Sequence, residues 1–196
     1  MQKMKDISQQ SCRRIIVVGT SGSGKTYAAK AIAAHMGIKY ICNDSLIWQA
    51  NWINVPDDQR LPGFEKATDC DAWVIDGNVA STKRPENALL LKRADTIVWL
   101  DLPRRTVWPQ LLWRTIKRSI TREELWHGNR ESFRLSFFSR DSILIWSFKT
   151  FTINRKRYQA MFNDEQWQHL QRIRITSRRS FKQWLSTLPA KVQTQS

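Results

Sequence analysis

The chain has 196 residues, of which 41% are hydrophobic and 25% charged, so its composition is globular and excludes a disordered tail, a collagen and a coiled-coil rod. No stretch approaches the roughly 20 apolar residues of a membrane helix, and the polar first ten residues lack the apolar core of a signal peptide, so we expect a cytoplasmic protein without a membrane partner. The 32 basic and 17 acidic residues give a formal charge of +15, which indicates partners that carry phosphate, either nucleic acid or small ligands, or else a solvated basic face.

Short apolar runs alternate with helical segments along the chain. Residues 15–18 are β-branched and end at Gly19, as expected for a central parallel strand that is buried on both faces. The alanine-rich segment Lys25–Met36 predicts a helix that ends at Gly37. Four more strands are predicted, with helices between them, at 38–42, 73–75, 96–102 and 172–176. This alternation predicts an α/β fold with a mainly parallel five-stranded sheet, whose ligands lie at the carboxyl ends of the strands.

Residues 104–160 differ from this pattern, because they are rich in arginine and tryptophan and read as a helical insertion between the fourth and fifth strands. Thr121-Arg122-Glu123-Glu124 fits a capping box and predicts a helix start, and His127-Gly128-Asn129 predicts a turn. From 104 to 157 the chain carries 13 basic and 4 acidic residues. Packing in the core or at an interface, rather than stacking on bases, is expected for the tryptophans of this region, Trp108, Trp113 and Trp146.

A phosphate-binding loop is the strongest signal in the sequence. The residues after the first strand satisfy GxxxxGK[ST] and lead directly into the first helix: Gly19, Thr20, Ser21, Gly22, Ser23, Gly24, Lys25 and Thr26. Glycines let backbone N–H groups wrap a polyphosphate, and the helix adds the positive end of its dipole. We expect Lys25 to reach the β- and γ-phosphates of ATP and the Thr26 hydroxyl to be a Mg²⁺ ligand, with water and phosphate oxygens as most of the other ligands.

Three aspartates follow predicted strands. Asp44, just after the second strand, is a candidate to accept the proton of an attacking hydroxyl, or else it caps the next helix. Asp76, after the third strand, is a candidate Mg²⁺ carboxylate that acts through water or by holding the direct ligands in place, or else a turn residue of an Asp-Gly pair. Asp101 ranks below both, since Pro103 predicts a structural turn there.

Arginines of the helical region are candidates for binding phosphate. Arg114 and Arg118 are four residues apart and share one helix face, so they are expected to grip the phosphates of ATP together. Arg130 and Arg134 have the same spacing beyond the predicted turn. We expect Arg130 to close over the γ-phosphate, where a guanidinium stabilises the charge that develops during transfer. The alternative for each arginine is a surface salt bridge.

The stretches GTSGSGKT, NDSLIW, WVIDGN, WLDLP and NRES together resemble the adenylate-kinase-like P-loop kinases, specifically the topology modulation proteins. The resemblance covers roughly 13–188. It implies one domain over 1–196, with a three-layer core at about 13–103 and 168–188 and a mobile, helical, basic lid at about 104–160. It also implies ATP and Mg²⁺ as ligands and phosphoryl transfer as the reaction. Asp76 matches the aspartate of the family's Asp-Gly pair, and Arg114 with Arg118 resemble its paired lid arginines.

The chain departs from adenylate kinases where those enzymes hold a monophosphate acceptor. Segments 43–50 and 78–82 contain no arginine, so a monophosphate bound in the usual manner is not expected. Asp44 resembles instead the aspartate with which shikimate-kinase-like and polynucleotide-kinase-like enzymes engage a hydroxyl acceptor.

These observations lead to one main functional hypothesis and two alternatives. The main hypothesis is an ATP- and Mg²⁺-dependent kinase of a nucleoside, a nucleotide or another small molecule, in which Lys25, Asp44 and Arg130 are catalytic and the partner is a hydroxyl- or phosphate-bearing acceptor. The alternatives are a nucleic-acid-associated ATPase that uses the basic second half and a nucleotide-binding regulator without transfer activity. The sequence leaves the acceptor and the oligomeric state open.

Overall fold

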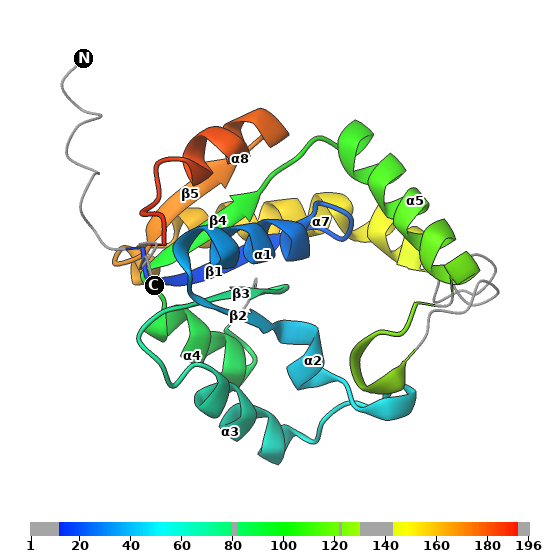
Figure 1. Ribbon diagram of the computed structural model, residues 1–196, viewed down its shortest axis with the longest axis horizontal. Coiled ribbons are helices and arrows are strands. Elements are labelled where there is room, and N and C mark those ends of the chain that lie inside the picture. Colours follow the sequence, from blue (N-terminus) through cyan, green and yellow to red (C-terminus); the bar gives the residue numbers. More distant parts are fainter. Residues whose placement is uncertain (1–11, 80–81, 122, 130–142, 192–196) are drawn as a thin grey trace, which may run out of the picture.

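The computed structural model describes residues 12–79, 82–121, 123–129 and 143–191 and contains a five-stranded parallel sheet of order β2-β3-β1-β4-β5 (Figure 1). The strands are β1 Arg14–Gly19, β2 Lys39–Cys42, β3 Trp73–Asp76, β4 Thr96–Leu100 and β5 Gln171–Ile175. Each lies within two residues of its predicted position, and every pairing between neighbours is parallel. The predicted fold class is confirmed.

Helices occupy most of the chain between the strands. The α-helices are α1 Lys25–Met36, α2 Asn43–Ile47, α3 Asp57–Ala67, α4 Pro85–Arg93, α5 Arg104–Thr121, α7 Ile143–Asn163 and α8 Arg178–Leu185. Three short 3₁₀ helices are η1 Ala50–Trp52, η2 Trp126–Gly128 and η3 Glu165–Trp167. Helix α1 has its predicted bounds and ends at Gly37, whose φ of +68° is the left-handed conformation of a C-cap glycine. Across the described part of the chain, no helix is long and apolar enough to cross a membrane.

The helices form a layer on each face of the sheet. On one face, α1 and α8 bury Ile32 and Phe181 against the strands. On the other, α3, α4 and α7 bury Phe64, Leu90 and Tyr158. The three-layer arrangement implied by the family resemblance is therefore present, and the C-terminal part of α7 belongs to the layer that covers the sheet.

The parallel pairing brings the candidate site residues to one edge of the sheet. Asp76 at the end of β3 is in register with Cys42 at the end of β2 on one side and with Val17 of β1 on the other. The phosphate loop leaves β1 at this edge, and Asp44 follows β2 by two residues. Residues that are far apart in the sequence therefore meet at the carboxyl ends of the strands, as expected for an α/β sheet.

Two predictions of helix ends are wrong. Helix α5 continues through Thr121, whose hydroxyl donates to the carbonyl oxygen of Lys117 at 2.9 Å, because a threonine within a helical turn can bond back along the helix. Asp44 does not cap α2, since Cys42 occupies the N-cap position and Asp44 lies inside the first turn. The turn predicted at 127–129 is present, with His127 and Gly128 at φ +55° and +78°.

The tryptophans of the helical region differ in their packing. Trp108 is half-buried and packs edge-on against Phe148, with ring centroids 5.2 Å apart, as predicted. Trp113 is 69% exposed, so it does not pack in the core, and its packing at an interface stays a prediction. It lies two residues from the fully buried Leu111, and two residues rotate a helical position by about 200°, onto the opposite face. The side chain of Trp146 lies outside the described residues.

Candidate active site

The phosphate loop connects β1 to α1 and contains all eight residues that the motif singled out. The Lys25 side chain folds back over it, and its Nζ donates to the carbonyl oxygens of Gly19 at 2.9 Å and Thr20 at 3.2 Å. Gly22 and Gly24 have φ values of +82° and +89°, which L side chains rarely adopt. The Lys25 amino group and the N-terminus of α1 therefore both lie at the phosphate loop, an arrangement suited to binding a polyphosphate.

Asp76 is buried beside the loop, with 6% of its surface exposed, and accepts a hydrogen bond on each carboxylate oxygen. Thr26 Oγ1 donates to Asp76 Oδ2, and the Tyr40 hydroxyl donates to Oδ1 at 3.1 Å. Burial, together with the neighbouring charge of Asp76, raises the pKa of Tyr40 well above its usual value, so Tyr40 remains a donor. Sequence reasoning singled out Thr26 and Asp76 together but missed Tyr40.

Lys25, Asp44 and Arg114 lie close enough to influence one another's charge. Burial and the positive charge of Arg114 lower the pKa of Lys25 to about 8, against the opposite effect of Asp44 and Asp76. Burial raises the pKa of the Asp44 carboxyl, against the opposite effect of Lys25. A carboxylate whose pKa is raised towards neutrality is better matched to accept a proton at physiological pH. The fold therefore joins the loop, the start of α2 and the middle of α5 in one site.

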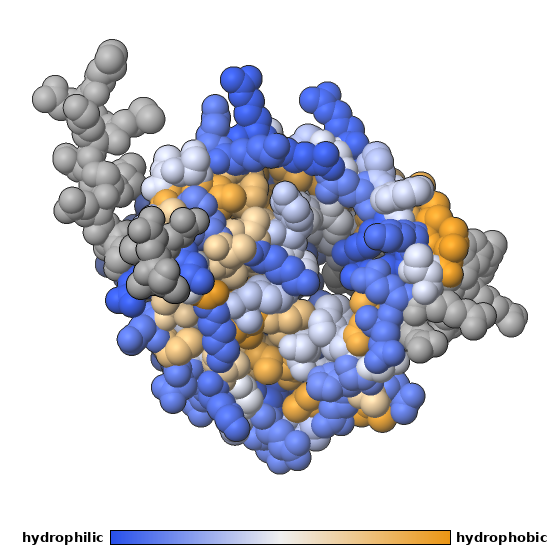
Figure 2. Space-filling view, in the orientation of Figure 1, coloured by the Kyte–Doolittle hydropathy of each residue, from blue (hydrophilic) through white to orange (hydrophobic). Residues whose placement is uncertain are grey.

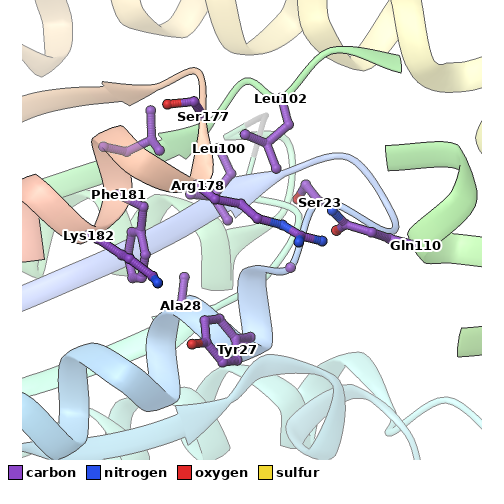
Figure 3. A pocket seen from close by; sticks show the side chains of 12 residues that line it. Ser23, Tyr27, Ala28, Leu100, Leu102, Gln110, Ser177, Arg178, Phe181 and Lys182 are labelled. Carbon is purple, nitrogen blue, oxygen red and sulfur yellow. The ribbon is translucent and has the colours of Figure 1, made fainter. Parts of the chain in front are cut away.

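A hollow opens in the middle of the face drawn in Figure 2, with hydrophilic side chains along α5 on one side of it. Next to the phosphate loop, a cavity of about 400 Å³ lies between α1, α5 and α8. Figure 3 shows Arg178 of α8 reaching across this cavity towards Gln110 of α5 and Ser23 of the loop, with Tyr27 and Lys182 nearer its other end. Of these residues, sequence reasoning had singled out Ser23 alone. For those of α8, the only local signal was the strand end before Ser177, which caps that helix.

The segment 125–129 packs against the end of α2 and the segment that follows it. Asn129 is 4% exposed, accepts from the Trp52 backbone N–H at 2.9 Å and donates to the Gln49 carbonyl oxygen at 2.8 Å. His127 Nε2 lies 3.1 Å from the Ser45 carbonyl oxygen. Three indole rings reinforce the contact. The centroid of the Trp52 ring lies 5.9 Å from that of Trp48 and 6.5 Å from that of Trp126. The middle of the predicted lid at 104–160 is therefore attached to the neighbourhood of Asp44.

The arginines predicted to bind phosphate differ in what the structure shows of their surroundings. Arg114 lies near Lys25, as its effect on that lysine shows. Arg118, one turn further along α5, pairs with Glu123 at 3.9 Å, which is the salt-bridge alternative for that residue. Arg130 and Arg134 lie outside the described residues. Contacts of any of these arginines with phosphate stay predictions.

Asp101, which the sequence ranked below Asp44 and Asp76, is buried and forms two ion pairs. Its Oδ1 lies 2.8 Å from Arg155 Nε of α7, and its Oδ2 lies 2.5 Å from Arg174 Nη2 of β5. The Arg174 guanidinium also stacks on the Trp99 ring, 4.8 Å from its centroid. These contacts tie the end of β4 to α7 and β5 and give the Asp101 carboxylate two basic partners.

Comparisons with known proteins identify similar kinases. No protein-family model matches the chain. A shikimate kinase of Synechococcus elongatus is 27% identical over 138 residues, which cover 61% of this chain and 72% of that protein. A shikimate kinase from Acinetobacter baumannii, solved in complex with shikimate, is similar over 92% of both chains with a TM-score of 0.52 and 17% identity. A gluconokinase from Sinorhizobium meliloti is similar over 91% of this chain and 90% of that one, with a TM-score of 0.50 and 18% identity.

These similarities indicate an ATP-dependent P-loop kinase of a small molecule. The solved structures share the fold of this chain, and the curated shikimate kinase is similar to it in sequence over 61% of its length. The prediction of an adenylate-kinase-like P-loop kinase is confirmed at that level. The alternative of a nucleic-acid-associated ATPase is not favoured.

Proposed function

We propose that the protein transfers the γ-phosphoryl group of ATP to a hydroxyl group of a small molecule. The observation that carries the proposal is the position of Asp44, a carboxylate close enough to Lys25 for each to shift the other's pKa. Lys25 is the residue expected at the β- and γ-phosphates, so Asp44 is near the phosphoryl group to be transferred. Asp44 also resembles the aspartate with which shikimate-kinase-like enzymes engage a hydroxyl acceptor.

In this proposal the loop residues 19–26 bind the phosphates of ATP, and the cavity between α1 and α8 receives its nucleoside. The cavity volume of about 400 Å³ is within the usual range for small-molecule sites. Arg178 and Lys182 at this cavity add positive charge, which suits a nucleotide.

Magnesium fits the side chains that surround the loop. Mg²⁺ prefers oxygen ligands and usually keeps several waters. Thr26 supplies a hydroxyl oxygen whose proton is donated to Asp76, so the oxygen lone pairs face away from that carboxylate. The described residues include no group of three or more His, Cys, Asp or Glu side chains able to hold a metal, so the proposed site depends on Thr26, water and phosphate, with Asp76 acting through them. When bound, the ion would neutralise charge on the transferred group.

The transfer step uses Asp44 as the proton acceptor. The acceptor hydroxyl oxygen forms a bond to the γ-phosphorus while the bond from that phosphorus to the β–γ bridging oxygen breaks, and ADP leaves. The hydroxyl proton passes to Asp44. Lys25 and Arg114 stabilise the charge on the phosphoryl oxygens, and we extend this role to Arg118 and Arg130 of the proposed lid at 104–160.

Two finer assignments stay proposals. The resemblance to topology modulation proteins rests in part on the stretches WVIDGN and WLDLP. These stretches contain the ends of β3 and β4, which supports membership of that group without testing it. A cytoplasmic location likewise stays a prediction. The acceptors to try first are shikimate and gluconate, which the names of the similar kinases suggest, followed by nucleosides and other polyols.

The test is ATP consumption with Mg²⁺ and each acceptor, with isolation of the phosphorylated product. Once an acceptor is found, Asp44→Asn should lower the transfer rate by about 10²- to 10⁴-fold, the range for a general base, with ATP affinity retained. Asp58→Asn, which removes an exposed carboxylate on α3, is the matched control and should keep the wild-type rate. Full activity of Asp44→Asn would remove Asp44 from catalysis, and tight ATP binding with no acceptor would favour the regulator.

A further inference from the structure

Tyr40 shares a sheet face with the carboxylate that the proposed magnesium site uses. In the parallel pairing of β2 and β3, Cys42 is in register with Asp76, and Tyr40 lies two residues earlier on β2. Side chains two residues apart on a strand point to the same face, and paired residues of neighbouring strands do so too. The Tyr40 ring therefore runs along the sheet surface towards Asp76 and ends with its hydroxyl 3.1 Å from Oδ1.

The hydrogen bonds of Asp76 form a chain from Tyr40 to the phosphate loop. Tyr40 donates to Oδ1, and Thr26 donates to Oδ2. When each oxygen of a carboxylate accepts a hydrogen bond, as in Asp76, the carboxylate cannot rotate freely about its Cβ–Cγ bond. Without Tyr40 it would be held on one side only, and the Thr26 hydroxyl would lose a fixed acceptor for its proton.

We propose that Tyr40 is a positioning residue for magnesium: it fixes Asp76, which in turn orients the Thr26 hydroxyl so that its oxygen faces the Mg²⁺ of the nucleotide complex. The proposal rests on the proposed function, because it assumes that Thr26 is a Mg²⁺ ligand. It assigns a role to a residue outside the loop motif, 14 positions after Thr26 in the sequence. Partners that orient metal ligands typically change metal affinity by about 10- to 100-fold when they are removed.

Packing is the competing explanation, since the Tyr40 ring also lies against the apolar cluster between α1 and the sheet. Tyr40→Phe separates the two roles, because phenylalanine keeps the ring and removes the hydroxyl. The measurement is the affinity for the β,γ-imido analogue of ATP by titration calorimetry, with Mg²⁺ and with a chelator. The ratio of the two affinities isolates the contribution of the metal and requires no acceptor.

We expect Tyr40→Phe to reduce this ratio by about 10- to 100-fold and to leave the affinity in chelator unchanged. Thr96→Val, which removes a buried hydroxyl at the start of β4, at the opposite end of the strands from the phosphate loop, is the matched control and should leave the ratio as in the wild type. In the Asp76→Asn background, Tyr40→Phe should have no further effect, because its action passes through that carboxylate.

Three results would overturn the proposal. One is a wild-type ratio in Tyr40→Phe, the second is an equal loss of affinity with and without Mg²⁺, and the third is the same loss in the Asp76→Asn background. If the wild-type protein itself gains no affinity from Mg²⁺, the magnesium site fails first and the role of Tyr40 fails with it. The wild-type titration thus separates failure of the proposed function from failure of this inference.

Discussion

Replacing Gly22 by alanine should destabilise the protein more than the same change at Gly24. Both glycines have left-handed backbones, which cost an L residue about 1–2 kcal/mol. A Cβ on Gly22 would also lie 2.7 Å from Leu111 Cβ and 2.9 Å from the Val107 carbonyl oxygen of α5, whereas a Cβ on Gly24 has nothing within 4 Å. Overpacking of this kind costs typically 1–3 kcal/mol. Gly22→Ala should therefore lose about 2–5 kcal/mol and Gly24→Ala about 1–2 kcal/mol.

Urea unfolding of the two variants, without nucleotide, measures this difference. The effect of alanine on the unfolded chain is the same at both positions and cancels in the comparison. In thermal unfolding, a difference of about 1–3 kcal/mol corresponds to about 2–12 °C in Tm for a chain of this size. Equal losses, or a larger loss for Gly24→Ala, would refute the argument that the loop is packed directly against α5.

Two further predictions concern the charge of the loop and the attachment of segment 125–129. Lys25 has a pKa of about 8, so the free protein loses the charge of this lysine as the pH rises through 8. ATP affinity should therefore fall about tenfold from about pH 7 to about pH 9. Calorimetry should find no such fall in Lys25→Met, and a flat pH profile for the wild type would contradict the reasoning. Asn129→Ala removes the hydrogen bonds to Trp52 and Gln49, so hydrogen exchange of the Trp52 amide should accelerate by about tenfold or more. Asn129→Asp keeps the acceptor oxygen and should give an intermediate exchange rate. An unchanged rate in Asn129→Ala would mean that the indole rings alone hold the contact.

The core and the phosphate loop were predictable because their signals are local. Apolar β-branched runs such as 15–18 are typical of buried strands. The motif at 19–26 predicts both the conformation of a loop and the helix that follows it. Asp44 and Asp76 were predictable from one further rule, that ligands gather at the carboxyl ends of parallel strands. Each of these conclusions needs only the neighbouring residues and the order of elements.

The residues that sequence reasoning missed act across long separations. Tyr40 reaches Asp76 from 36 positions away, and Asn129 reaches Gln49 from 80 positions away. A tyrosine in a strand and an asparagine in a turn each have an ordinary local explanation, so the pattern contains no sign of a partner. Strand register and loop docking decide these contacts, and both are properties of the folded chain. The wrong helix start at Thr121 has the same origin, because its capping pattern is local while the length of α5 is set by packing.

The contacts of the region 104–160 bear on how a lid would move. Gly22 of the loop packs against α5 at Leu111, and Asn129 is bonded beside α2. Tyr158 of α7 lies beneath the loop, with its hydroxyl donating to the Gly19 carbonyl oxygen at 3.3 Å. Movement of this region as one body would break all three contacts, two of which hold the phosphate loop itself. The contacts therefore count against movement of the whole region as one lid, because the first half of α5 and the end of α7 support the phosphate loop.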